Sequence, residues 1–547
     1  MRKPVKIALI VVGSVVAIAI AALVSVDIWA SRVANKSIQS WLAGLEDSQL
    51  KVSVGEIHVG LLTGTIGIED IYFATDTGTF DIQEKRKLPG MEVQVPLVTF
   101  ELVNYYELLR HHNIRMYGIT VHEPNAVVWL DEKHPERCLP VFPKDTSLSK
   151  ANIPLHEIGV NRIRLSRANA KLKSVRTSLL ARADSLTAEV HDLMFNLTDT
   201  TFAYNDSNFL VKANRLYARL PDGSMDFSVN NLKIEDEEGL KLGKTRIRNI
   251  IGIEKMAERA QEPVAWIDVQ LRRLQTSPFN PIRKALAQDL TLDSIYADVE
   301  QLHVKQDNHI PPKRPYSTPQ EFLLKLPVRF EIKSVEALAR HVHIELTLTG
   351  DKFGQLELDN IHAHLRNVTN RPKAEWRNYV HGKLGDKGHI EAIYTMYMTK
   401  EAKFECQMNG HDIELDILNP FMRPLVGITC ESHVDKLETH YTGDKTTASG
   451  DFLMMFHGME VAVHKEDDIA IKPIQQHAKT IENLANSLVT KSNPSAVDTA
   501  PRRYMVEWKN DPWKPYPLFV FGPCINGAVE TLLPGLYVHK QIRETRK

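Results

Sequence analysis

The stretch HVHIELTLT, at residues 341–349, decides the fold class of this chain. Its apolar side chains are those of Val342, Ile344, Leu346 and Leu348. They alternate with polar side chains, which is the pattern of a strand with one apolar face and one wet face. The same alternation recurs at residues 52–68, 227–234, 390–398 and 452–463, and the best helical pattern is confined to residues 474–491. We therefore expect a mainly β protein.

An apolar motif recurs along the chain. Counted from its first residue, apolar side chains stand at +3, +5, +10 and +12 in copies that begin at Met116, Val160, Leu292 and Ile332. The first two copies place Ile119, Val121, Ile163 and Leu165 at +3 and +5. This spacing predicts a strand, a short kink and a second strand. The intervals between copies are 44, 132 and 40 residues, the middle one being about three such periods. A period near 40 residues indicates an array in which neighbouring units bury one another's apolar faces. The alternative is that an apolar β protein produces such matches without a true repeat.

A charge-free run near the start of the chain predicts a membrane anchor. Residues 7–26 read IALIVVGSVVAIAIAALVSV, and as a helix they would span about 30 Å, the thickness of a bilayer core. Basic residues precede the run and Asp27 follows it, which predicts a cytoplasmic N-terminus with Trp29 at the membrane surface. An uncleaved anchor is favoured over a cleaved signal because the Ala-x-Ala triplets lie inside the apolar run.

Composition excludes several classes of function. Lys plus Arg total 67 and Asp plus Glu total 68, so the net charge of −1 argues against nucleic-acid binding. The four cysteines, Cys138, Cys406, Cys430 and Cys524, form no CxxC pattern and are interpreted as buried thiols. The sequence carries no GxSxG, HExxH, Walker or GxGxxG motif. We expect no enzyme activity and no cofactor.

Histidines raise the question of a metal site. If a hairpin centres on residues 352–353, His343 faces His362 and His341 faces His364, and four imidazoles on one face could bind Zn²⁺ or Cu²⁺. The favoured alternative is a solvated outer face, because a one-residue slip in register separates the four rings. No metal site is therefore assigned.

The last apolar stretch, residues 518–533, is too short and too interrupted by glycine and proline to span a bilayer. Its aromatic side chains and those just before it are candidates for membrane contact: Trp513, Tyr516, Phe519 and Phe521. Basic residues follow the stretch, which also suits a membrane surface. The alternative is a cap that covers the last apolar face of the array.

Several segments together carry a family resemblance. Residues 52–73 hold an amphipathic β start with a turn at Gly64, and residues 95–130 hold a short Leu108–Leu109 element and a strand pair that closes on Pro124. Residues 415–463 contain a Leu-Asn-Pro-Phe turn that leads into strands, and residues 511–535 form a short amphipathic segment near the C-terminus. With the anchor, these segments resemble the AsmA-like proteins of Gram-negative envelopes, in their YicH-type branch.

This resemblance implies a fold and a function. The fold is an N-terminal transmembrane helix followed by an elongated, groove-forming, taco-like antiparallel β repeat array with short helices. Relatives are regarded as bridge-like carriers of phospholipid, anchored in the bacterial inner membrane with their bulk in the periplasm. Residues 181–260 depart most from the pattern, which leaves the strand count there open.

The expected organisation follows from these segments. It comprises a cytoplasmic start (1–6), an anchor (7–26), a juxtamembrane helix or linker (27–49), a β-groove body (50–470), a helix (471–493), a linker (494–512) and an amphipathic C-terminal segment (513–547).

We expect a protein that carries or bridges phospholipid between the inner and outer membranes. The groove floor would include the aliphatic residues at 119, 121, 163, 165, 342, 344, 346 and 348. The expected partners are membrane lipid and, at the C-terminus, a second membrane or an envelope protein. The alternative is a membrane-tethered periplasmic scaffold that affects outer-membrane protein assembly, and an envelope hydrolase or adhesin is the least favoured reading.

Overall fold

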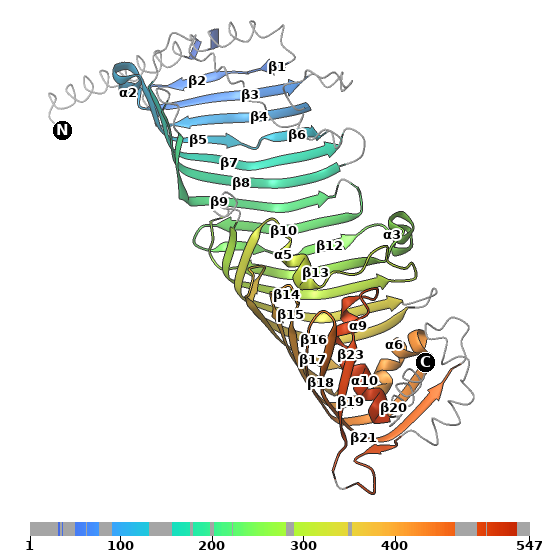
Figure 1. The fold of residues 1–547 in the computed structure, drawn as a ribbon. Coiled ribbons are helices and arrows are strands. Elements are labelled where there is room, and N and C mark those ends of the chain that lie inside the picture. Colours follow the sequence, from blue (N-terminus) through green and yellow to red (C-terminus); the bar gives the residue numbers. More distant parts are fainter. Residues whose placement is uncertain are drawn as a thin grey trace, which may run out of the picture. The chain divides into compact units, whose positions relative to one another are not determined.

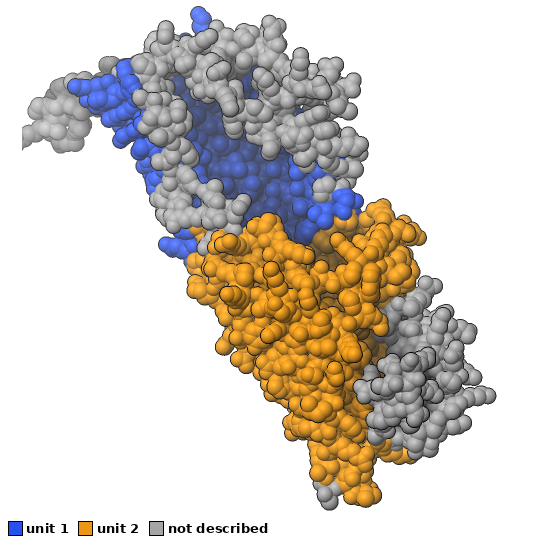
Figure 2. All heavy atoms as spheres, viewed as in Figure 1, with its two compact units in different colours: residues 1–223, 227–242 blue, residues 224–226, 243–547 orange. Residues whose placement is uncertain are grey.

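The computed structural model describes residues 31–32, 35–36, 50–61, 63–75, 90–130, 156–174, 179–196, 202–220, 222–280, 289–347, 353–464, 490–498 and 500–532. The chain divides into two compact units, coloured separately in Figure 2. Unit 1 comprises residues 1–223 and 227–242, and unit 2 comprises residues 224–226 and 243–547. Both units are mainly β, as the alternating sequence predicts.

Unit 1 contains one short helix, α2 (Tyr105–His111), among its described elements. Its strands are β1 (Leu50–Ser53), β2 (Ile57–Gly60), β3 (Thr65–Thr75), β4 (Gly90–Glu101), β5 (Asn113–His122), β6 (Asn125–Leu130), β7 (Glu157–Ser174), β8 (Leu179–Asn196), β9 (Phe202–Arg219), β10 (Met225–Glu235) and β11 (Gly239–Leu242).

Neighbours in the chain are mostly neighbours in the unit 1 sheet (Figure 1). Strands β1 and β2 both pair with β3, which pairs with β4. Strands β5 and β6 lie end to end between β4 and β7, antiparallel to the first and parallel to the second. Strands β7, β8 and β9 then follow as antiparallel neighbours. The sheet is therefore mixed, whereas the sequence led us to expect an antiparallel one.

Unit 2 has strands β12 (Thr245–Asn249), β13 (Val264–Thr276), β14 (Asp289–Asp307), β15 (Arg329–Thr347), β16 (Gly354–Thr369), β17 (Glu375–Leu384), β18 (Gly388–Tyr397), β19 (Phe404–Glu414), β20 (Ile428–Gly443), β21 (Thr447–Val463), β22 (Ser492–Asn493) and β23 (Arg503–Lys509). Its helices are α3 (Ile253–Ala260), α5 (Pro319–Leu324), η4 (Leu415–Leu418), α6 (Asn419–Val426), α9 (Tyr516–Val520) and α10 (Gly522–Leu532).

The unit 2 sheet is also mixed. Strands β12 to β21 pair in chain order, and β22 and β23 both pair with β21. Among the described strand pairs of this unit only β14 and β15 run parallel, and the connection between them carries α5. Within that connection, the Tyr316 amide donates to the Pro512 carbonyl at 2.7 Å. The connection therefore reaches the segment just before α9.

The repeated motif coincides with the parallel pairs of strands. Met116 lies opposite Val160, and the +3 and +5 positions pair in the same register. The copy at Leu292 lies opposite the copy at Ile332 in the same way, through to Val304 and Ile344. Two copies of one pattern match position for position only if their strands run in the same direction, so the repeat itself explains the parallel pairs.

The kink that the motif predicts is present in unit 1. Asp70, Glu123, Arg167 and Ser185 have φ angles of 49°, 48°, 52° and 52°, in the left-handed region that interrupts a strand. Glu123 and Arg167 occupy the same motif position in neighbouring copies, and their side chains form an ion pair. Irregular residues of this kind bend strands and curve a sheet.

Some expected boundaries are wrong. Residues 494–512, expected to be a linker, contain strand β23, and the end of the expected helix 471–493 contains strand β22. The Leu-Asn-Pro-Phe turn is the start of helix α6, where Pro420 stands in the first turn and needs no backbone N–H partner. The expected short element near Leu108 is α2, and the turn at Gly64 has a φ of 65°. Residues 7–26 lie outside the described residues.

Candidate functional site

Two continuous apolar rows cross seven strands of unit 1. Residues opposite one another on paired strands share a face of the sheet. The first row consists of Val59, Ile66, Phe100, Ile119, Ile163, Val190 and Phe209. The second row consists of Ile57, Ile68, Val98, Val121, Leu165, Ala188 and Val211. With strands about 4.8 Å apart, each row is about 29 Å long.

Most side chains in these rows remain partly accessible. Ile119, Val121, Ile163 and Leu165 are half-buried, and of the two rows only Ile57 and Phe209 are buried. An apolar side chain in a central strand becomes almost completely buried once a second layer packs on it. Phe404 and Phe452 of unit 2 illustrate that state, each being 1 % exposed. The rows therefore carry apolar surface that the rest of the chain covers only in part, and Figure 2 shows unit 1 hollowed on the side in view.

The opposite face of unit 1 is polar and internally paired. Arg162 NH2 lies 2.9 Å from Glu101 Oε2, and the Thr120 hydroxyl donates to Glu101 Oε1 at 2.9 Å. Arg164 lies 3.8 Å from the Glu189 carboxylate. These residues alternate with the apolar rows along the same strands, so the sheet has one face of ion pairs and one face of aliphatic side chains.

Apolar rows also cross the first strands of unit 2. One row runs Ile267, Val304, Ile344 and Leu356, and the next runs Val269, Leu302, Val342 and Leu358. Val342 is buried, Ile344 and Leu346 are half-buried, and all three share one face of β15. Leu348, the fourth expected floor residue of this strand, lies outside the described residues.

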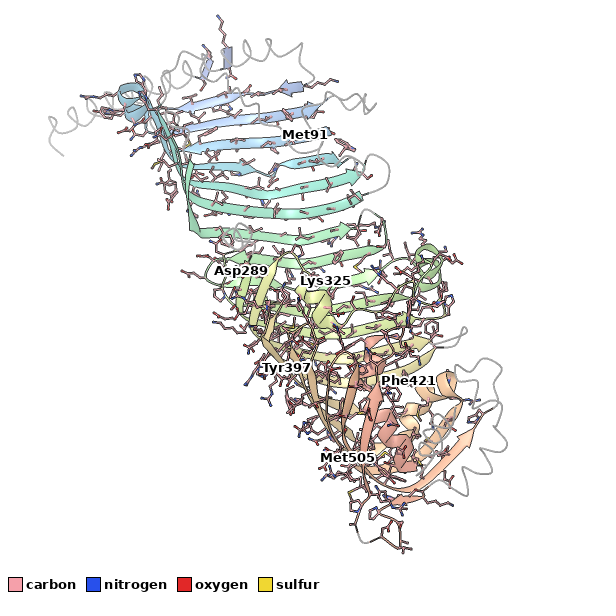
Figure 3. The ribbon with its side chains drawn as sticks, viewed as in Figure 1. Met91, Asp289, Lys325, Tyr397, Phe421 and Met505 are labelled. Carbon is pink, nitrogen blue, oxygen red and sulfur yellow. The ribbon has the colours of Figure 1, made fainter. Side chains whose placement is uncertain are left out.

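Farther along unit 2 the apolar face is closed by helices. One buried cluster contains Leu384, Ile413, Cys430, Val434, Phe452, Met454, Phe456, Met459 and Val506. Partly buried residues from α6 and α10 pack against it, among them Met422, Cys524, Ala528 and Leu532. Side chains fill the space between these helices and the strands (Figure 3). This part of the sheet has an ordinary protein core.

A second cluster brings α9 onto the sheet. Phe404, Cys406, Tyr441, Ala448 and Phe519 form its buried centre. The Tyr441 hydroxyl donates to the Val520 carbonyl at 2.7 Å, and the hydroxyls of Tyr394 and Tyr516 lie 3.1 Å apart. Burial raises the pKa of both Tyr394 and Tyr441 well above the usual tyrosine value. The hydroxyls of these two tyrosines are therefore shielded from solvent.

The structure divides the C-terminal candidates for membrane contact. Phe519 is 3 % exposed and belongs to the second cluster, and Tyr516 packs against the same cluster. Phe519 thus lies in the core of the cap that we had considered as the alternative, with Tyr516 packed against it, and membrane contact at this end of the chain stays a prediction. Trp513 and Phe521 are about half exposed, at 50 % and 49 %. Trp29 lies outside the described residues.

The four-histidine cluster, the less favoured of the two readings of the sequence, does not form. The hairpin of β15 and β16 pairs His343 with Glu357 and His341 with Asp359, so the register differs by five residues from the predicted one. His362 and His364 instead lie opposite Leu338 and Glu336.

Sequence reasoning missed a different polar group on the same strand. His343 lies opposite His303 of β14, and Glu345 contacts both imidazoles. The 40-residue offset between two motif copies contained this signal, because it also places residue 303 beside residue 343.

No helix among the described residues combines the length and the apolar character needed to cross a membrane. No family model, no curated protein and no solved structure matches this chain.

Proposed function

We propose that the two apolar rows of unit 1 hold the acyl chains of phospholipids, and that the protein carries or bridges phospholipid between two membranes. The observation that supports this most directly is the pair of aliphatic rows that remain half-buried although they occupy central strands. Each methylene of an acyl chain that leaves water for such a surface contributes about 0.8 kcal/mol. Many similar aliphatic side chains in a row offer no single deep site, which suits movement along the face.

The polar face supports the same proposal. Its charges are paired with one another, so one side of the sheet tolerates water while the other favours hydrocarbon. In this proposal the rows line the hollow of unit 1. Residues 7–26 anchor the chain in a bacterial inner membrane, and the bulk of the protein lies in the periplasm.

Part of unit 2 favours a second candidate function. The apolar face of β16 to β21 is filled by the protein's own helices, which leaves no acyl-binding surface at the two buried clusters. A membrane-tethered scaffold that affects outer-membrane protein assembly would have such a closed core throughout. The half-buried rows of unit 1 favour lipid binding over this alternative.

The test compares two neighbouring substitutions in β9. Val211→Glu places a carboxylate in the second row, whereas Lys212→Gln changes the net charge equally at an exposed residue of the opposite face. The full-length proteins are purified in parallel, and the bound phospholipid is quantified by mass spectrometry. We expect at least one phospholipid per chain in the unmodified protein and in Lys212→Gln, and a several-fold loss in Val211→Glu.

Equal lipid content in all three proteins would contradict the assignment of the rows. Absence of phospholipid from the unmodified protein would favour the scaffold. A circular dichroism spectrum of each variant verifies that the strands are retained.

A further inference from the structure

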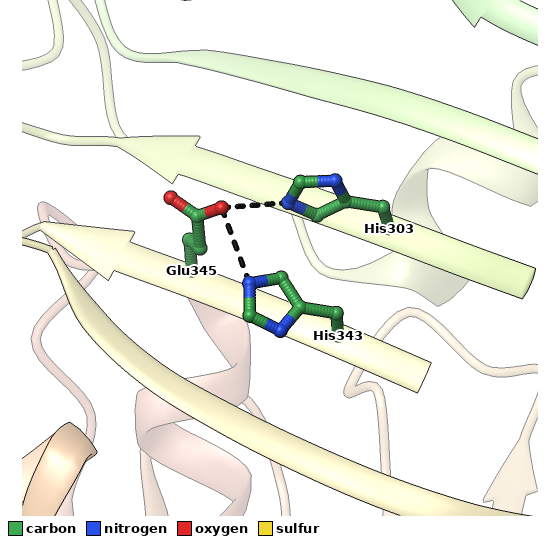
Figure 4. Close-up of side chains that lie close together, drawn as sticks. All are labelled: His303, His343 and Glu345. Atoms are coloured by element: carbon green, nitrogen blue, oxygen red, sulfur yellow. Dashed lines mark hydrogen bonds and ion pairs between the residues drawn. The ribbon is translucent and has the colours of Figure 1, made fainter. Parts of the chain in front are cut away.

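Two histidines and a glutamate, His303, His343 and Glu345, lie close together on β14 and β15 (Figure 4). They occupy the polar face of these strands, opposite the apolar rows. His303 and His343 are direct neighbours in the parallel pair, and Glu345 follows His343 by two residues. Because successive side chains of a strand alternate between faces, residues 343 and 345 point to the same side. The parallel register then brings the third side chain, His303, against both.

The ligand atoms converge. His303 Nε2 lies 2.7 Å from Glu345 Oε1, and His343 Nε2 lies 3.2 Å from the same oxygen. One ligand atom from each of the three residues lies within 4.8 Å of the others, and the two imidazole centroids are 4.6 Å apart. Zinc ligands stand about 2.0–2.2 Å from the ion, so tetrahedral ligand atoms are about 3.3–3.6 Å apart. Small side-chain rotations would accommodate an ion between the three atoms.

The surrounding residues orient this group. Glu357 Oε1 lies 3.3 Å from Nδ1 of His343, which leaves Nε2 of that ring directed at Glu345. A carboxylate that holds the far nitrogen of a histidine is a common feature outside the ligands of zinc sites. Lys305 Nζ lies 2.8 Å from Glu345 Oε2, so the other carboxylate oxygen faces the imidazoles. The indole of Trp266 packs edge-on against His303 with centroids 5.2 Å apart.

Burial distinguishes this group from the other histidine pairs of the same face. The Glu345 side chain is 9 % exposed, and those of His303 and His343 are 21 % and 24 % exposed. The rings of His362 and His381 also stack across two strands, with centroids 4.8 Å apart, but this pair belongs to no three-ligand group among the described residues. The pair of His362 and His381 therefore serves as a matched control.

We propose that Nε2 of His303, Nε2 of His343 and an oxygen of Glu345 bind one Zn²⁺ ion, with a fourth position open to water. Two imidazoles and one carboxylate are a ligand set that zinc accepts in proteins. The ion joins β14 to β15 on the polar face, and Lys305 offsets part of the negative charge of Glu345. This site is independent of lipid binding, since it lies on the opposite face of the sheet.

The test measures Zn²⁺ affinity in the full-length protein without a polyhistidine tag. The protein is stripped with a chelator, and Zn²⁺ is titrated in competition with a chromophoric chelator. We expect one high-affinity site per chain, weakened at least about tenfold in each of His303→Ala, His343→Ala and Glu345→Gln. The control His381→Ala keeps the affinity of the unmodified protein. An unmodified protein that binds no more tightly than His303→Ala would overturn the proposal, and so would an equal loss in His381→Ala.

A further variant tests the electrostatics of the site. Lys305→Met removes a positive charge beside Glu345, so we expect tighter Zn²⁺ binding by a few-fold. Weaker binding in this variant would show that Lys305, and not a metal ion, organises the three side chains, and would overturn the proposal. Cobalt substitution gives a second readout, because a tetrahedral Co²⁺ site has intense visible absorption bands that His303→Ala should lose.

Discussion

At the scale of single residues, the thiols of three cysteines reflect how tightly the closed part of unit 2 is packed. Cys406 and Cys430 are buried free thiols, and Cys524 packs against both core clusters. Burial raises the pKa of Cys430 to about 11 and that of Cys524 to about 12, against about 8.5 for an exposed thiol. At pH 8 such a thiol is ionised in about one molecule per thousand or fewer, and the thiolate is the reactive form.

We therefore expect these two thiols to resist alkylation in the folded protein. Iodoacetamide at pH 8 should leave the peptides that contain Cys430 and Cys524 unmodified under native conditions and label both in urea. Peptide mass spectrometry measures each residue separately. Rapid native labelling of Cys524 would contradict the packing of α10 on the sheet. The sequence predicted buried thiols from the wide spacing of the cysteines, and Cys406 and Cys430 confirm that prediction.

In β15 and β16 the sequence predicts which face a residue lies on, but not which residue it lies opposite. Alternation placed Val342, Ile344 and Leu346 on one face of a strand, and the structure agrees. Alternation cannot fix the length of the turn that follows, so the partner of His343 was predicted five residues away from its actual position. This difference in register places His362 and His364 opposite Leu338 and Glu336, farther along the strand pair from His341 and His343, so the histidine cluster does not form.

At the scale of elements, the C-terminal helices fit the sheet through closely placed glycines. A Cβ atom at Gly527 of α10 would overlap the ring of Phe452, and one at Gly522 would overlap the indole of Trp508. Both contacts involve bulky rings that hold the helix against β21 and β23. The small residues therefore allow α10 to approach the sheet.

Gly527→Ala tests this fit. We expect the variant to lose about 1–3 kcal/mol of unfolding free energy, because an added methyl group in a packed core forces the ring or the helix to move. Gly159→Ala is the control, since a Cβ there would make only ordinary contacts, the nearest with Arg115 at 3.7 Å. Urea denaturation followed by tryptophan fluorescence measures both variants. Equal midpoints for Gly527→Ala and the unmodified protein would contradict the close packing of α10.

The sequence predicts some elements and their pairing better than others. The repeat predicted which segments resemble one another, and its matching register explains the parallel pairs β5–β7 and β14–β15. The sequence did not decide whether residues 518–533 meet a membrane or cap the sheet, because an apolar helix with aromatic flanks suits either. That choice depends on whether the sheet face beneath is already covered, which is a property of the assembled fold.

At the scale of the whole molecule, the described strands have two kinds of apolar face. Unit 1 carries half-buried rows on central strands, whereas the later strands of unit 2 carry two core clusters whose buried residues are 1–7 % exposed. Lipid binding is therefore expected along the rows of unit 1 and along β13 to β15 of unit 2, and not from β16 onward, where Leu356 and Leu358 pack against the first buried cluster. β15 belongs to the part of unit 2 where Ile344 and Leu346 are half-buried.

Substitution of these two residues tests transport itself. Ile344→Glu plus Leu346→Glu should abolish transfer of fluorescent phospholipid between donor and acceptor vesicles, because two carboxylates in the row repel acyl chains. Lys383→Gln plus Lys387→Gln is the control, since it changes the net charge equally at exposed residues. Undiminished transfer by the double-glutamate protein would exclude β15 from the lipid-binding face.

The central claim is that acyl chains lie on the apolar rows, and a photo-crosslinking scan tests it most directly. A benzophenone amino acid is introduced in the full-length protein, one position at a time, at Ile163, Leu165 and Val211, and at the opposite-face residues Arg164 and Lys212. After irradiation in membranes, bound phospholipid is detected by mass spectrometry of the crosslinked peptides. The account predicts phospholipid adducts at the three row positions and none at the two opposite-face positions. Equal crosslinking on both faces, or none on either, would contradict it.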